Sequence, residues 1–175
     1  MATSVQVPLN EYLSTSYRPD REYVDGMLVE RNVGQSEHAR IQALLTALFI
    51  SMEEEWGTHT FTEQRFRTRD TRFRIPDILL TSARPQPPVI TEAPILCVEI
   101  LSPEDSMAEM KKKGVEFFER GARAVWIIDP AQRCGYWSLG AQDEWHKAVR
   151  MEGPMPTMYV DLEPIFRKAD RSLMR

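Results

Sequence analysis

The sequence has 175 residues, of which 42% are hydrophobic, enough for one globular domain that buries about two-thirds of its unfolded surface. Its two cysteines, Cys97 and Cys134, have no CxxC spacing, which argues against a disulfide framework and a cysteine-based zinc site. The formal net charge of −4 argues against a chain that coats nucleic acid indiscriminately, although it says nothing about a local basic strip.

The N-terminal stretch has no basic start followed by an apolar core, and no window approaches the roughly 18 apolar residues of a membrane helix. With the low cysteine content, this predicts a soluble, cytoplasmic protein. No repeat or low-complexity run divides the chain. We therefore expect a single domain over residues 1–175, with residues 1–8 and 165–175 as loosely packed termini.

The first part of the chain predicts two helices and a hairpin. A short helix is expected at residues 9–16, and Asp25-Gly26 between two apolar runs predicts antiparallel strands over residues 21–32 that open the sheet. Residues 36–56 follow as an amphipathic helix with Ser36 as its expected N-cap. Its apolar stripe should lie on the sheet and consists of Ile41, Leu44, Leu45, Leu48 and Met52.

From residue 58 the pattern changes to the period of two that is typical of strands. It places Arg65, Arg67 and Arg69 on one face, with Asp70-Thr71 as a candidate turn. The chain then enters the apolar stretch "RIPDILL", and the following Pro-rich segment is short enough to be a surface connection.

A strand, a helix and a second strand are predicted next. The continuous apolar run at residues 94–102, "PILCVEILS", is typical of a central strand that is covered on both faces. Residues 102–121 should form a helix, capped by Ser102 or Asp105 and stopped by Gly121. The apolar strand at residues 122–130 completes a succession that favours a right-handed crossover and a parallel strand pair.

The rest of the chain predicts further strands. Residues 134–139 and 144–151 are expected as a hairpin that extends one sheet edge, and residues 156–166 as a short wrap over the surface. The whole pattern indicates an α/β domain.

Two acids stand in apolar strands, Asp77 in "RIPDILL" and Glu99 in "ILCVEILS". A buried carboxylate is costly unless it is hydrogen-bonded, paired or bound to a cation, and two on neighbouring strands would repel each other. A divalent metal between them resolves both problems. The alternative is that each acid lies at a strand end and points to solvent or caps a neighbouring element.

The predicted helix at residues 102–121 contains three consecutive lysines. At about 100° per residue, Lys112 points away from the apolar face, and Lys111 and Lys113 flank that face. Lys113 stands one turn before Phe117, so its stem could follow the buried face while its ammonium reaches the strand ends. The alternative is an ordinary solvated lysine run.

A proline-aspartate that opens one strand, followed by an acid in a second apolar strand, resembles the PD-(D/E)XK nuclease superfamily. That pattern has a lysine two positions after the second acid, where this chain has Leu101. Four segments resemble the Uma family of restriction-endonuclease-like proteins within that superfamily. They are "YRPDREYVDGMLVERNVGQSEHARI", "RIPDILL", "CVEILSPEDS" and "KGVEFFERGARAVWIIDP", between about residues 12 and 130.

The resemblance implies a restriction endonuclease-like core, with a mixed central sheet flanked by helices, and hydrolysis of phosphodiesters. Asp77, Glu99 and the carbonyl of Ile100 would hold Mg²⁺ or Mn²⁺. Lys113 would replace the missing lysine and orient water or neutralise the phosphate. The resemblance also assigns Glu22 to the site, although an exposed acid beside a turn is the alternative, and His38 is expected to have a surface or capping role.

Two expectations concern partners. Arg65, Arg67 and Arg69 would guide nucleic acid, in the first place DNA, to the metal site, unless they form an ordinary solvated strand face. Because a single metal site cuts one strand, cleavage of a duplex calls for a second copy, so we expect a homodimer.

Three other functions remain open at this point. The chain could be a catalytically inactive nuclease-fold module that binds DNA, or a metal-dependent phosphoesterase that acts on a smaller substrate. It could also be a partner-binding scaffold, although a scaffold has no need to bring acids and a lysine together from separate elements.

Overall fold

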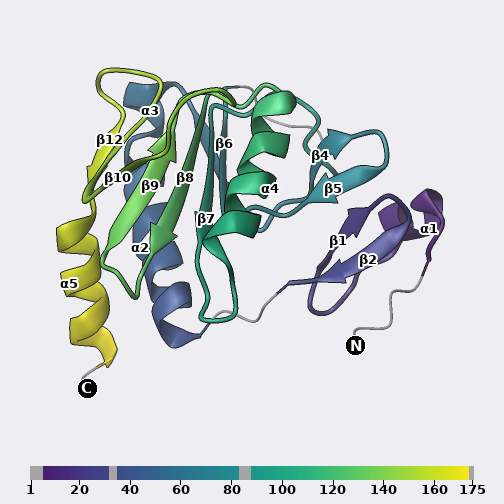
Figure 1. Ribbon diagram of the computed structural model, residues 1–175, viewed down its shortest axis with the longest axis horizontal. Helices are drawn as coiled ribbons and strands as arrows, with labels where there is room; N and C mark the ends of the chain where they lie inside the picture. Colours follow the sequence, from purple (N-terminus) through teal and green to yellow (C-terminus); the bar gives the residue numbers. More distant parts are fainter. Residues whose placement is uncertain (1–5, 32–34, 83–87, 174–175) are drawn as a thin grey trace.

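The computed structural model describes residues 6–31, 35–82 and 88–173, and Figure 1 shows how their elements are arranged. The helices are α1 (Leu9–Ser14), α2 (Ser36–Ser51), α3 (Glu53–Trp56), α4 (Met107–Glu119) and α5 (Leu162–Leu173). The first six strands are β1 (Arg21–Val24), β2 (Met27–Glu30), β3 (His59–Thr62), β4 (Phe66–Arg69), β5 (Arg72–Arg74) and β6 (Ile78–Thr81). The others are β7 (Leu96–Ile100), β8 (Ala124–Asp129), β9 (Cys134–Ser138), β10 (His146–Ala148), β11 (Arg150–Glu152) and β12 (Tyr159–Asp161).

The main sheet has the strand order β10-β9-β8-β7-β6-β3. β7 and β8 run parallel, as the strand-helix-strand pattern predicts, and the other neighbours are antiparallel. Helix α4 covers one face of this sheet, and α2 and α5 lie on the other (Figure 1). The predicted fold class, a mixed α/β fold with a mixed central sheet flanked by helices, is confirmed.

Strand β7 is buried along its whole length because helices cover both faces of the sheet. Leu96, Val98 and Ile100 join the core cluster that contains the buried residues of α2. Cys97 joins the cluster that contains Phe117 of α4. Since successive strand residues point to opposite faces, Glu99 faces α4 as Cys97 does.

A second sheet, with the order β2-β1-β5-β4, lies beside the main one. The predicted hairpin forms with Val24 opposite Met27. The sequence predicts that it opens the main sheet, but it pairs with β5 in the small sheet, so that expectation is wrong. Helix α1 packs on this sheet through Tyr12, whose ring stacks on Tyr23 at a centroid distance of 4.9 Å. The hairpin is thus held in a separate layer, apart from the main core.

The helix boundaries differ slightly from the predicted ones. Gln35 occupies the N-cap position of α2, with Ser36 as the first helical residue. The hydroxyl of Ser106 caps α4 by accepting a hydrogen bond from the Glu109 N–H, so neither Ser102 nor Asp105 is the cap. Gly121 follows α4 with a φ of +101°, the conformation that makes glycine a helix stop.

The C-terminal segment is more ordered than the sequence analysis predicts. Strand β12 pairs with β11, and α5 packs against α2 and buries Ile165, Phe166 and Ala169 in the main core. The expectation of a loosely packed end at residues 165–175 is therefore wrong for these three residues. Val7, inside the expected loose N-terminus, is buried too, and residues 1–5 lie outside the described part.

In the described ranges, none of the helices combines the length and the apolar character that crossing a membrane requires.

We expect Phe166→Ala to lower the free energy of unfolding by about 3–5 kcal/mol, because it removes a fully packed aromatic ring from the main core. The matched control is Arg167→Ala, since the neighbouring side chain is 59% exposed and should contribute little. Urea denaturation of both variants measures the difference. Equal stability of the two variants would show that α5 is not part of the cooperative core.

Candidate functional site

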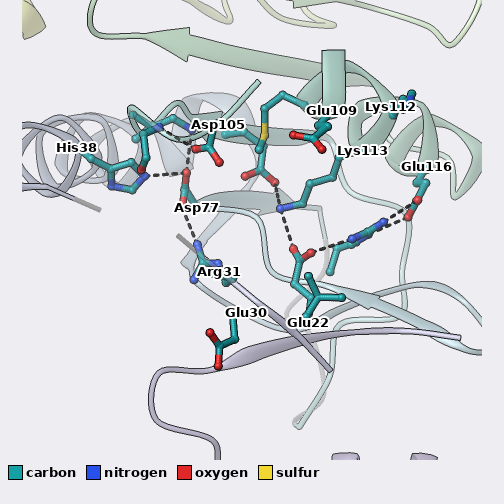
Figure 2. Close-up of a pocket in the computed structure, with 16 residues that line it drawn as sticks. Glu22, Glu30, Arg31, His38, Asp77, Asp105, Glu109, Lys112, Lys113 and Glu116 are labelled. Carbon is teal, nitrogen blue, oxygen red and sulfur yellow. Dashed lines mark hydrogen bonds and ion pairs between the residues drawn. The ribbon is translucent and has the colours of Figure 1, made fainter. Parts of the chain in front are cut away.

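An open pocket of about 520 Å³ lies where α4 and the end of β7 face the β1–β2 hairpin. Figure 2 shows acidic and basic side chains converging on it from separate elements. Its deepest acids are Glu22 from β1, Asp77 directly before β6 and Glu99 from β7, each 3–4% exposed. Three buried carboxylates at one pocket must be balanced by cations or hydrogen bonds.

Lys113 joins two of these acids. Its Nζ lies 2.7 Å from Glu22 Oε1 and 2.8 Å from Glu99 Oε1. The three lysines of α4 diverge as the helical spacing predicts: Lys112 lies exposed at the pocket rim, and Lys111 lies over the rings of Tyr136 and Trp145. Helical periodicity thus correctly sets Lys112 aside, and of the two lysines that it leaves, Lys113 is the one that reaches the strand ends.

Glu22 is held by more than the lysine. Arg74 Nη1 donates to its Oε2 at 2.9 Å, and the backbone N–H of Ile75 donates to its Oε1 at 3.0 Å. Arg74 in turn binds Glu116, one turn after Lys113 on α4, at 2.7 and 2.9 Å. This chain of charges fixes the hairpin relative to α4 and so fixes Glu22 in the pocket. The alternative, an exposed acid beside a turn, does not describe Glu22.

Both carboxylate oxygens of Asp77 are engaged. Arg31 Nη2 donates to Oδ1 at 2.6 Å, the backbone N–H of Ile100 donates to Oδ2 at 2.8 Å, and His38 Nε2 lies 3.1 Å from Oδ2. Gln42 of α2 also donates to the backbone carbonyl of Asp77 at 3.0 Å. His38 is therefore a partner of Asp77, and the expectation of a surface or capping role is wrong.

The surroundings shift the pKa values of the three acids in different directions. Burial disfavours a charged Glu22, but Lys113 and Arg74 outweigh it and lower its pKa to about 2. Burial is likewise outweighed at Asp77, where the hydrogen bond and charge of His38, together with Arg31, lower the pKa. Burial raises the pKa of Glu99 to about 7, and the negative charges of Asp77 and Glu22 add to the rise.

The cations respond in the opposite sense. Burial alone would lower the pKa of Lys113, but Glu22 and Glu99 outweigh it and raise the pKa, so the ammonium stays charged. Asp77 raises the pKa of His38 against the effect of burial in the same way. Glu99 is thus the acid whose charge the neighbouring side chains neutralise least.

The pocket suits a hard divalent cation that takes only a few of its ligands from the protein, and its described residues do not form a closed metal cage. Across residues 6–31, 35–82 and 88–173, no three His, Cys, Asp or Glu side chains are grouped as a metal site. Asp77 and Glu99 remain as donors, with the carbonyl of Ile100 beside them. Mg²⁺ is commonly held by one or two carboxylates, with water and substrate oxygens completing its shell. The residues present fit such an ion.

The structure does not bring the predicted arginine strip to the pocket, because Arg65, Arg67 and Arg69 are absent from its lining. Arg65 binds Asp20 at 2.6 Å and lies over the Tyr12 ring at 4.4 Å, so it fastens α1 to the small sheet. Arg69 pairs with Glu119, and the register of β4 against β5 shifts between Arg67 and Arg69. Nucleic-acid contact by these arginines stays a prediction.

Arg31, His38, Arg74 and Glu116 bind the acids or their partners in the pocket, and sequence patterns do not assign them to the site. His38 and Arg31 lie 39 and 46 positions from Asp77, so no local pattern connects them. Arg74 gives a weak signal, because it precedes "IPD" and alternates with Phe73, whereas Glu116 gives one only as the residue one helical turn after Lys113.

We expect the metal-free protein to become more stable as the pH falls from about 8 to about 5. The folded pKa of Glu99, about 7, lies above its ordinary value of 4.5, so the folded chain takes up a proton that the unfolded chain does not. Acidification through this window therefore favours folding. Glu99→Gln should flatten the dependence, leaving the part due to His38, whose folded pKa is also raised.

Urea denaturation in EDTA at a series of pH values measures the slope for both proteins. Identical slopes for the wild type and Glu99→Gln would rule out a raised pKa at Glu99.

Comparisons with known proteins agree with the fold and identify the family. The Uma2 family model, described as "Putative restriction endonuclease", matches residues 9–154, a range that includes Glu22, Asp77, Glu99 and Lys113. The crystal structure of a "putative nuclease belonging to DUF820" from Anabaena variabilis is similar in fold. Its TM-score is 0.78 at 22% identity, over 93% of this chain and 99% of that one. No curated protein matches the chain. Since the family match spans most of its length, the chain belongs to the Uma2 family of putative restriction endonucleases.

Proposed function

We propose that the protein is a metal-dependent endonuclease of the PD-(D/E)XK type that hydrolyses phosphodiester bonds in nucleic acid, in the first place DNA. One observation carries the proposal: Glu22, Asp77, Glu99 and Lys113 converge on one open pocket from four segments that are separate in the sequence. Membership of a family described as "Putative restriction endonuclease" supports the same reaction class.

The cost of this arrangement supports a functional role. Buried ion pairs rarely improve stability over apolar residues of the same shape, because desolvation offsets much of the attraction. Perturbed pKa values in a cleft are typical of functional sites, and Glu99 and Lys113 are both perturbed by burial and by specific charged partners. A scaffold protein would gain nothing from such a cluster, so this observation argues against the third alternative.

Asp77 and Glu99, with the Ile100 carbonyl, would hold Mg²⁺ or Mn²⁺. When bound, the ion would polarise a phosphoryl oxygen and lower the pKa of water. Glu99 would gain most from it, because its charge is the least neutralised of the three. Glu22 holds Lys113 from the opposite side and so sets the position of the ammonium.

Lys113 is suited to electrostatic stabilisation. Its pKa is raised, so at neutral pH the ammonium carries no free lone pair and cannot act as a base. It can donate hydrogen bonds to a phosphate oxygen or to the attacking water. A fixed positive charge in a partly desolvated site stabilises the negative charge that develops on the phosphate.

We expect Mg²⁺- or Mn²⁺-dependent cleavage of plasmid DNA or single-stranded oligonucleotides by the wild type. Asp77→Asn and Lys113→Met should each reduce the rate by about a hundredfold or more, because each removes a charge from the proposed site. The matched control is Lys111→Met, which changes a lysine of the same run that lies outside the pocket lining. A metal-titrated cleavage assay measures all four proteins.

Circular dichroism and gel filtration check that the variants fold. Undiminished cleavage by folded Asp77→Asn would contradict the proposed site. Metal binding that Asp77→Asn abolishes, without turnover on any nucleic acid, would favour the inactive DNA-binding module. Turnover restricted to small phosphodiesters would favour the phosphoesterase.

We also propose a homodimer, since two copies would present two sites to the two strands of a duplex. Sedimentation velocity at micromolar concentration should show the dimer mass. A monomer at every concentration, with or without a DNA duplex, would contradict the dimer while leaving the single-site chemistry intact.

A further inference from the structure

Arg31 differs from the other partners of Asp77 in where it comes from. His38 belongs to α2 and Ile100 to β7, and both contact Oδ2. Arg31 follows β2 of the hairpin and reaches Oδ1 across the pocket (Figure 2). The two oxygens are therefore held from two sides, one by the main layer and one by the hairpin.

The contact of Arg31 also differs in kind from the contact that the backbone of Ile100 makes with Oδ2. The Ile100 N–H belongs to the main chain of a fully buried strand and cannot leave without disturbing the sheet. Arg31 is a long side chain, 19% exposed, that lines the open pocket and also lies 3.8 Å from Glu63. Its contact with Asp77 can be exchanged by rotating side-chain bonds alone.

A divalent cation and a guanidinium compete for the same carboxylate oxygen. Arg31 lies 2.6 Å from Oδ1, so a cation bound to the same oxygen would come within a few ångströms of the guanidinium, and two positive charges at that separation repel each other in a partly desolvated site. A displaced guanidinium beside a metal site has a natural alternative partner, because its planar fork matches phosphate oxygens in geometry and charge.

We infer that Arg31 alternates between two partners: Asp77 Oδ1 in the metal-free protein, and a phosphate oxygen of the substrate when a divalent cation occupies Asp77. The inference rests on the proposed nuclease function and assigns a residue that its mechanism does not use. Arg31 neutralises Asp77 until the metal arrives and then adds a phosphate contact beside the site. Metal binding and substrate binding are thereby coupled through one side chain.

The coupling predicts a change in metal affinity that can be measured without catalytic turnover. Since Arg31 and the cation exclude each other, removing Arg31 should tighten metal binding. We expect Arg31→Met to bind Mn²⁺ about 5- to 150-fold more tightly than the wild type, the usual range of a coupling between two ligands. Arg31→Lys, which keeps the charge and loses the planar guanidinium, should bind Mn²⁺ with an affinity between those of the wild type and Arg31→Met.

Isothermal titration of Mn²⁺ into the metal-free proteins measures this. Lys112→Met is the matched control, because it removes one positive charge from the pocket rim without a contact to Asp77. Lys112→Met should gain much less Mn²⁺ affinity than Arg31→Met. Urea denaturation confirms that each variant folds.

The second arm uses a short fluorescent DNA duplex and fluorescence anisotropy, in EDTA and in Ca²⁺, with a gel to verify that the duplex stays intact. Arg31→Met should weaken duplex binding about tenfold or more in Ca²⁺, because a charge-assisted phosphate contact is lost. In EDTA the same substitution should have little effect, since Arg31 is then engaged with Asp77.

The outcomes separate this inference from the proposed function. Mn²⁺ binding by the wild type that Arg31→Met does not tighten would overturn the inference and leave the metal site standing. An equal loss of duplex affinity with and without Ca²⁺ would also overturn it, because Arg31 would then act only as a general positive charge. Absence of Mn²⁺ binding in both wild type and Arg31→Met would overturn the metal site and the inference together.

Discussion

The pocket is organised by the need to neutralise three carboxylates that have almost no contact with bulk water. Each acid has its own solution: Glu22 has Lys113, Arg74 and a backbone N–H, Asp77 has Arg31, His38 and a backbone N–H, and Glu99 has Lys113. Without these partners the buried charges would destabilise the fold by several kcal/mol each. The positions of α2, α4 and the hairpin relative to the main sheet follow from these pairings as well as from apolar packing.

The two-sheet architecture makes these pairings possible. Strand β7 is covered on both faces, so its alternate residues serve two layers: Val98 packs toward α2, while Glu99 faces α4 and meets Lys113. The hairpin supplies Glu22 and Arg31 from the other side of the pocket, and the Arg74–Glu116 pair fastens the small sheet to α4. No single element contains the site, which exists only where the layers meet.

The three acids are not neutralised equally, and this difference affects both the stability of the fold and the chemistry of the site. The positive charges around Glu22 lower its pKa to about 2, whereas the pKa of Glu99 is raised to about 7. A site that leaves one acid poorly compensated is less stable when metal-free at neutral pH than a fully paired one, and a cation would reverse this deficit. Such a trade between stability and function is common where a binding site is built from buried charge.

Local patterns in the chain are enough to predict most helices and strands, the α/β class and the two acids that need a partner once they are buried. The apolar stretches around Asp77 and Glu99 and the choice of Lys113 over Lys112 follow from periodicity, which is a local property of the chain. The parallel β7–β8 pair follows from the succession of strand, helix and strand. The terminal helix α5 also has a local pattern, because its buried residues Ile165, Phe166 and Ala169 recur at helical spacing. Three features depend on tertiary packing: the hairpin joins β5 and not the main sheet, Arg65 fastens α1, and Arg31 and His38 meet Asp77. These contacts join residues about 40 to 50 positions apart, and the pairing of such distant charges depends on how the layers pack, which no period in the sequence encodes.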